Sequence, residues 1–252
     1  MFEYLGLIIL GFVAGIIGSM IGLGGGFVVV PILTFFGFSP QLAASNSLFA
    51  AFSNAVASTM SYAKQKRIDY SLGLKLGLFS IPGTILGAYI SDGITPSSFK
   101  ILFGIVLLAS SIYIFLKRKM ESKDYNLSKQ IMVLAVGASF FAGIISSLFG
   151  IGGGVVFVPL MVIAIGLSMK MAAPTSQFIL LFASASGMTA HAFLGHPDFY
   201  QALFLSIGAF AGGLVGSRLS LQVEEKKLRI LVTVVLVITA IKLFADSLRV
   251  PF

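Results

Sequence analysis

Long apolar tracts, separated by short polar segments, follow one another along the whole chain. They cover residues 4–36, 42–63, 71–91, 99–116, 131–166, 172–194, 200–219 and 228–247. A helix that crosses a lipid bilayer needs about 20 mostly apolar residues, and six of the tracts have roughly that length. The first and fifth are too long for one such helix and too short for two. This pattern predicts an all-α polytopic membrane protein embedded in a lipid bilayer.

An internal repeat divides the chain into two similar parts. Residues 14–31 (AGIIGSMIGLGGGFVVVP) recur at 142–159 (AGIISSLFGIGGGVVFVP), an offset of 128. After one inserted residue, an offset of 129 pairs Tyr62 with His191 and Asp69 with Asp198. Such self-similarity indicates two homologous halves. We expect a first membrane repeat at residues 1–119, a cytoplasmic linker at 120–129 and a second membrane repeat at 130–252.

Charged residues are scarce and gather in the short loops. They make up 10% of the 252 residues, against about 25% in ordinary soluble domains, and the mean hydropathy is +1.02. The net charge of +8 comes mainly from residues 64–67, 117–129 and 226–229. Excess Lys and Arg in short loops marks the cytoplasmic side of a membrane. The basic balance therefore indicates orientation in the cell membrane and not binding of nucleic acid.

The loop charges also predict how the halves are related. The basic loop at 64–67 corresponds to residues 193–196, and the loop there, up to residue 198, carries no Lys or Arg. Corresponding loops are then on opposite sides, which indicates inverted repeats with three transmembrane helices in each half. The tracts 4–36 and 131–166 become re-entrant hairpins, each a first segment broken by glycine. Eight ordinary spans in parallel repeats are the alternative.

Two glycine runs carry the strongest functional signal. A glycine in a helix interior costs about 1 kcal/mol relative to alanine, so clustered glycines predict a break in the helix. Broken backbone at membrane depth is tolerated only inside the protein or beside a cavity, and the helix that follows directs free N–H groups towards an anion. Tight helix packing without a ligand is the alternative, because Gly11, Gly15 and Gly18 also form a small-residue face. The expected substrate-binding glycines are Gly22, Gly24, Gly25, Gly26, Gly150, Gly152, Gly153 and Gly154.

Small polar residues follow each glycine run at matching positions. Asn46 and Ser47 correspond to Thr175 and Ser176, and Gln177 comes next. We expect these five side chains to complete an uncharged anion site, although polar groups on membrane helices also serve as interhelical hydrogen bonds. Secondary candidates are the polar side chains Asn54, Tyr62 and His191 and the cations Lys75 and Arg218.

What the chain lacks narrows the chemistry further. It contains no cysteine and two histidines, so we expect neither disulfides, nor a metal site, nor a cofactor. No Asp or Glu lies deep within a predicted span. Cation sites in membranes rely on such carboxylates, and the substrate is therefore expected to be a small anion. Residues 1–4 lack the basic region of a signal peptide, so the first tract is expected to be retained.

The doubled glycine element resembles the sulfite exporter TauE/SafE family of anion permeases. The resemblance rests on a G-x-G-G-G-x₄-P element at residues 22–31 and 150–159, and on the polar pair that follows each copy. The first pair departs from the usual Thr-Ser by being Asn46-Ser47. Membership implies a multi-pass plasma-membrane permease for sulfite, an organosulfonate or a related sulfur oxyanion, working by alternating access between the repeats.

Two other functions compete with this interpretation. An anion channel would use the same site. An intramembrane hydrolase would need Ser184 or Ser186 beside His191, but Ser184 is seven residues from His191 on one helix, about 10.5 Å along its axis, too far to activate a nucleophile. We therefore expect no enzymatic activity. A coupling proton or ion and a homo-oligomer are both left open.

Overall fold

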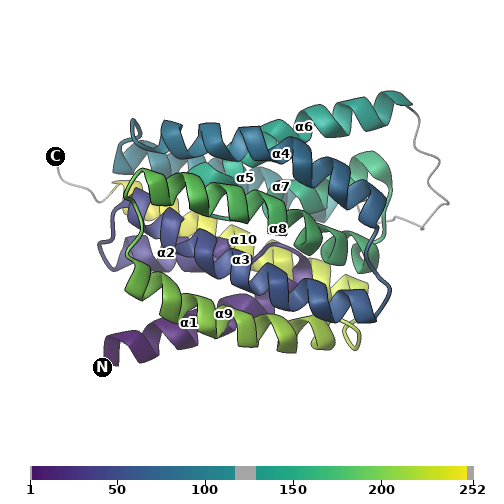
Figure 1. Ribbon diagram of the computed structural model, residues 1–252, viewed down its shortest axis with the longest axis horizontal. Helices are drawn as coiled ribbons and strands as arrows, with labels where there is room; N and C mark the ends of the chain where they lie inside the picture. Colours follow the sequence, from purple (N-terminus) through teal and green to yellow (C-terminus); the bar gives the residue numbers. More distant parts are fainter. Residues whose placement is uncertain (1, 117–128, 249–252) are drawn as a thin grey trace.

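The structure, a computed structural model, describes residues 2–116 and 129–248 as a bundle of helices (Figure 1). No strand occurs in these two ranges. The elements of the first half are α1 (Phe2–Ile21), α2 (Gly26–Phe35), α3 (Pro40–Lys64), α4 (Tyr70–Ser91) and α5 (Pro96–Leu116). Those of the second half are α6 (Lys129–Phe149), α7 (Gly154–Pro159), the π-helix η1 (Leu160–Ile165), α8 (Met169–Phe193), α9 (Phe199–Leu219) and α10 (Glu225–Leu248).

The helices match the apolar tracts of the sequence. Six tracts each form one helix, and the first and fifth are each broken at the glycine run, into α1 and α2 and into α6 and α7. The predicted all-α fold with a glycine-broken first segment in each half is confirmed. α2 continues through Pro31. α7 passes into the π-helix at Pro159, because proline removes one backbone hydrogen bond and disturbs the helix around it.

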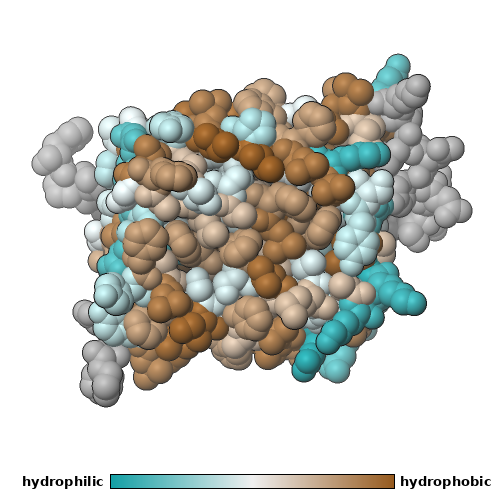
Figure 2. Space-filling model, in the orientation of Figure 1, coloured by the Kyte–Doolittle hydropathy of each residue, from teal (hydrophilic) through white to brown (hydrophobic). Residues whose placement is uncertain are grey.

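The outer surface is suited to lipid. Apolar side chains cover the middle of the molecule and polar ones gather towards its two ends (Figure 2). Four helices, α1, α4, α6 and α9, are long and apolar enough to cross a membrane within the described residues. Since α1 and α6 are among them, the choice between re-entrant hairpins and full crossings stays a prediction. α3 and α8 carry many of the buried small polar residues and run through the interior.

The two halves are interleaved. α1 lies along α9 and α6 lies along α4, so that the first helix of each half packs against the third long helix of the other. α3 likewise packs against α9, α8 packs against α4, and α3 and α8 contact each other, while α5 contacts α10. Neither half therefore buries its own apolar surface alone. The predicted repeat boundaries stay a prediction, because nearly all of the linker at 120–129 lies outside the described residues.

Glycines permit the closest of these helix contacts. A Cβ atom on Gly83 or Gly87 would collide with the backbone of α6, and one on Gly208 or Gly212 would collide with the backbone of α1. Small residues let membrane helices approach in this way. The GxxxG spacings of the third and seventh apolar tracts are thus packing contacts.

Loops from different halves meet at both ends of the molecule. At one end, the Arg67 side chain donates a hydrogen bond to Ser220 Oγ at 3.1 Å. At the other, the His196 ring contacts Asp92 at 2.6 Å. Residues 67 and 196 correspond in the repeat, so corresponding loops lie at opposite ends, at the right and left of Figure 1. We refer to these as the Arg67 end and the Asp92 end.

Candidate functional site

Each glycine run folds into a tight turn between two helices. We call residues 22–25 and 150–153 the two glycine turns. Glycines in both adopt the left-handed region of backbone conformation, which side chains rarely tolerate, and the two turns repeat the same pattern. The φ angles are 79°, 79° and 84° at Gly22, Gly24 and Gly25, and 67°, 70° and 90° at Gly150, Gly152 and Gly153.

The two turns touch each other in the interior. A Cβ atom on Gly26 would collide with the carbonyl oxygen of Gly150, and one on Gly154 would collide with that of Gly22. All four glycines are buried. The predicted substrate-binding glycines are therefore brought together from both halves, and their close contact also explains why no larger residue would fit.

Serine side chains fasten each turn to the opposite half. Ser47 Oγ of α3 donates a hydrogen bond to the Gly150 carbonyl at 2.7 Å, and Ser176 Oγ of α8 donates to the Gly22 carbonyl, also at 2.7 Å. We call this symmetric pair the serine clasp. Both hydroxyls lie beside the glycine turns as predicted, but in this conformation their protons are directed to backbone carbonyls.

Several backbone N–H groups at the turns have no acceptor. Among the described residues, nothing accepts a hydrogen bond from the amides of Gly25, Gly26 and Phe27, or from those of residues 152–155. All of these residues are buried. Buried backbone donors are paired in the great majority of cases, so a group of seven without acceptors is unusual. These amides stand at the start of α2 and α7, where the helix dipole is positive.

Buried polar side chains near the turns are also left with spare capacity. Gln177 Nε2 donates to the Gly18 carbonyl at 2.9 Å, while its Oε1 has no partner. The hydroxyls of Ser146 and Ser147, at the end of α6, have none, and neither does Asn54 Nδ2, which lies further along α3 beside Gly213. Gln177 and Asn54 were predicted from the sequence, whereas Ser146 and Ser147 were not. Their position directly before the second glycine run is the signal that could have identified them.

The first members of the two polar pairs lie elsewhere. Asn46 Oδ1 accepts a hydrogen bond from the Asp198 amide at 3.0 Å, and Thr175 Oγ1 accepts one from the Asp69 amide at 3.0 Å. Each thus holds the start of a long helix of the opposite half. No hydrogen bond within the described residues joins either side chain to a glycine turn.

Tyr62 and His191 occupy equivalent positions. The Tyr62 hydroxyl donates to the Ser19 carbonyl at 2.8 Å, and His191 Nε2 contacts the Ser147 carbonyl at 3.1 Å. Each of these carbonyls also accepts from the first amide of its glycine turn. Both candidates therefore contact the backbone that supports the turns.

The predicted cations are not part of this arrangement, because Lys75 and Arg218 are both exposed. Arg67 is the cation that the structure places next to candidate residues. It lies 5.3 Å from the Tyr62 ring centre and bonds the Lys170 carbonyl at 2.9 Å. Partial burial lowers the pKa of Arg67, although a guanidinium remains charged at neutral pH.

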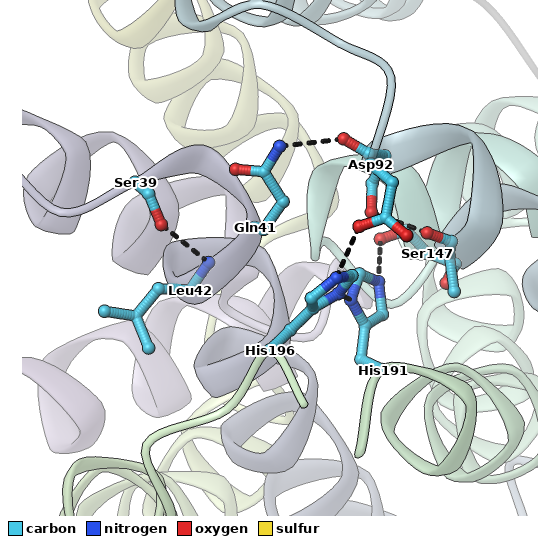
Figure 3. Close-up of polar contacts among 9 residues, drawn as sticks. Ser39, Gln41, Leu42, Asp92, Ser147, His191 and His196 are labelled. Atoms are coloured by element: carbon cyan, nitrogen blue, oxygen red, sulfur yellow. Dashed lines mark hydrogen bonds and ion pairs between the residues drawn. The ribbon is translucent and has the colours of Figure 1, made fainter. Parts of the chain in front are cut away.

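His191 begins a chain of polar contacts that leads to the surface (Figure 3). Its Nδ1 lies 2.7 Å from Nδ1 of His196, and Nε2 of His196 lies 2.6 Å from Asp92 Oδ1. Sequence reasoning identified His191 alone. The repeat offset pairs Arg67 with His196, which could have indicated that both loops contribute to the site.

The side chains near His191 do not form a hydrolase triad. Ser184 donates to the Leu180 carbonyl and Ser186 to the Phe182 carbonyl. In the described part of the chain, no cluster of three His, Cys, Asp or Glu residues could hold a metal ion.

Comparisons with known proteins agree with one another. The model of the family described as "Sulfite exporter TauE/SafE" matches residues 7–243. The chain is similar to the probable membrane transporter protein YunE of Bacillus subtilis, with 33% identity over 96% of this chain and 97% of the relative. It is also similar to the probable membrane transporter protein MJ0441 of Methanocaldococcus jannaschii, with 30% identity over 91% of each chain. These relatives are named as transporters and not as enzymes. No solved structure matches.

Proposed function

Because the chain belongs to the TauE/SafE sulfite exporter family, a family of membrane transporters, we propose that it transports a small sulfur oxyanion across the cell membrane. The candidates are sulfite, an organosulfonate or a related anion. The observation that carries the proposal is the group of buried, acceptor-free amides at the two glycine turns. The substrate would bind there, between the halves.

The chemistry of the turns suits an oxyanion. Backbone N–H groups at helix starts hold anionic oxygens without a full positive charge. The spare hydroxyls of Ser146 and Ser147 and the second N–H of Gln177 add side-chain donors. The nearest cations of the loops lie at the ends of the molecule, so the attraction comes from dipoles. An oxyanion with several oxygens could accept from both turns at once.

The same arrangement supports alternating access. The turns are buried, and each is fastened by the serine clasp to the opposite half, so a substrate reaches them only when the halves move relative to each other. The corresponding loops at opposite ends support inverted repeats, which alternate by exchanging the conformations of their halves. A channel would instead need a continuous path.

Transport by the purified protein in proteoliposomes tests the proposal. We expect saturable uptake of sulfite or of one among thiosulfate, taurine, sulfoacetate and sulfate, with mutual competition between accepted anions. Uptake that rises linearly with concentration would favour a channel. Absence of uptake for the whole panel, by protein that is folded by size exclusion and thermal unfolding, would contradict the substrate class.

Substitution of the glycines would not separate binding from packing. A Cβ atom on Gly25 would lie 2.8 Å from the Ala14 carbonyl oxygen, in a left-handed conformation, so a defect would also follow from strain. Side-chain variants next to the turns are the sharper test.

A further inference from the structure

Asp92, His196 and His191 form a continuous path from the surface to the glycine turns. The Asp92 side chain is 51% exposed, the His196 side chain 10%, and His191 is fully buried. The inner end of the path contacts the Ser147 carbonyl, three residues before Gly150. Figure 3 shows the two rings between Asp92 and Ser147. We call these three side chains the histidine chain.

The hydrogen bonds of the histidine chain require an additional proton. Its contacts, at 3.1, 2.7 and 2.6 Å, need one proton each. Two neutral imidazoles carry one ring proton apiece and a carboxylate carries none, which leaves the chain one proton short. With one more proton bound, all three contacts are hydrogen bonds and the net charge is zero. Without it, the two atoms of one contact face each other with their lone pairs and have no proton between them.

We propose that the histidine chain is a proton-binding site that delivers a proton from the Asp92 end to the anion at the glycine turns. The inference rests on the proposed function for the presence of that anion. In the transfer, the Nε2–H bond of His191 breaks and a bond forms to an oxygen of the anion. The proton between the two Nδ1 atoms moves from His196 to His191, and that of the Asp92 carboxyl moves to His196 Nε2. One proton leaves Asp92 and one reaches the anion.

Hydroxyl groups without a hydrogen-bond partner lie at the place where the proton would reach the anion. The hydroxyls of Ser146 and Ser147 are buried and have no partner in the described structure. They lie on the element that the inner ring contacts, next to the second glycine turn. An anion held there could replace the Ser147 carbonyl as the acceptor for His191.

Among the described residues, the opposite end of the molecule has no equivalent titratable path. The repeat places Tyr62 and Arg67 where the second half has His191 and His196. Their partner across the loops is the Ser220 hydroxyl in place of a carboxylate. A phenol and a guanidinium do not change charge near neutral pH, whereas imidazole does. Within the part of the chain that the structure describes, protons are therefore delivered only from the Asp92 end, so the two ends of the pseudo-symmetric molecule differ in function.

Among the described residues, other charged groups near the histidine chain are few. The titratable groups that act on His191 are His196 and Asp92. Asp198 belongs to the same loop as His196, but its carboxylate caps α9 by accepting from the amides of Tyr200 and Gln201. From α3, the neutral Gln41 donates to the Ser91 carbonyl beside Asp92.

Two measurements test the proposal, and the first of them does not depend on the identity of the anion. The chain has two histidines, so nuclear magnetic resonance of protein labelled with 15N only in histidine reports on these two rings alone. We expect them to titrate as a coupled pair, and Asp92→Asn to move both titration midpoints to lower pH, because a neighbouring carboxylate stabilises the protonated rings. Independent titration of the rings, unaffected by Asp92→Asn, would overturn the proposal.

The second measurement is sulfite flux in proteoliposomes with and without a pH gradient. We expect the gradient to stimulate net flux in the unmodified protein, and Asp92→Asn and His196→Gln to lose the stimulation while retaining sulfite–sulfite exchange. Gln41→Leu, a neutral change at the same end, should keep both. Stimulation that survives in Asp92→Asn and His196→Gln would overturn the histidine chain. If the unmodified protein moves no sulfite, the proposed anion is wrong, and the coupled or independent titration of the rings decides the histidine chain.

Discussion

At the scale of single residues, Gln177 distinguishes the two halves at the candidate site. Its amide lies beside the first glycine turn, with one N–H on the Gly18 carbonyl and an unpartnered oxygen. The repeat offset places Leu48 at the corresponding position of the first half. The site is thus not symmetric, and the side chain that breaks the symmetry is a buried amide able to donate a second hydrogen bond.

We expect Gln177→Leu, which copies the residue of the other half, to weaken anion binding and also to lower the free energy of unfolding by about 0.5–1.5 kcal/mol, because the hydrogen bond to the Gly18 carbonyl is lost. A hydrogen bond to a charged group contributes about 1.5–3 kcal/mol, which corresponds to a rise of roughly 10-fold to 100-fold in KM for transport. The matched control is Ser53→Ala, which removes a partly buried hydrogen bond from α3 to the Ser206 carbonyl. Equal KM values for both variants and the unmodified protein would show that Gln177 does not bind the anion.

At the scale of elements, the serine clasp connects the glycine turns to α3 and α8. The clasp bonds have equal lengths and opposite origins, so the two halves hold each other in the same way. We expect Ser47→Ala and Ser176→Ala each to lower the free energy of unfolding by about 0.5–1.5 kcal/mol, the usual net contribution of one hydrogen bond. Denaturant unfolding in detergent would measure this.

The double variant, Ser47→Ala with Ser176→Ala, tests whether the two bonds of the serine clasp are energetically coupled. If the two serines only stabilise the folded state independently, their effects on unfolding should add. We also expect a changed rate of transport, because both bonds hold the buried conformation together. Unchanged unfolding and transport in the double variant would show that the clasp bonds contribute nothing measurable.

The helices and their interruptions could be predicted because they depend on local sequence. An apolar tract of sufficient length predicts a helix, and a cluster such as Gly24, Gly25 and Gly26 predicts where the helix is interrupted. The contacts between halves could not be predicted in this way. Ser47 meets Gly150 across 103 residues and His196 meets Asp92 across 104, and nothing local indicates that each half packs against the other. Asn46 and Thr175 were expected at the turns, whereas they accept hydrogen bonds from the amides of Asp198 and Asp69, the residues that cap α9 and α4.

At the scale of the whole molecule, the loops at the two ends differ in charge. The exposed Lys64 and Lys66 lie at the Arg67 end, together with the first turn of α10, which carries Lys226 and Lys227. Asp92 and Asp198 lie at the other end. By the rule that basic loops stay in the cytoplasm, we expect the Arg67 end to face inwards and the histidine chain to open to the outside.

Single cysteines provide a direct measurement of this orientation, because the chain contains none of its own. We expect Lys66→Cys and Gln222→Cys to react with a membrane-impermeant maleimide only after the cells are opened, and Thr95→Cys and Pro197→Cys to react in intact cells. Positions 66 and 197 lie in corresponding loops of the two repeats, so their opposite accessibility is what inverted repeats require and what parallel repeats of eight spans forbid. Labelling of both from the same side would replace the inverted arrangement. It would also contradict the structure, in which Arg67 and His196 lie at opposite ends of one helical bundle and so cannot face the same side of a membrane that the bundle spans.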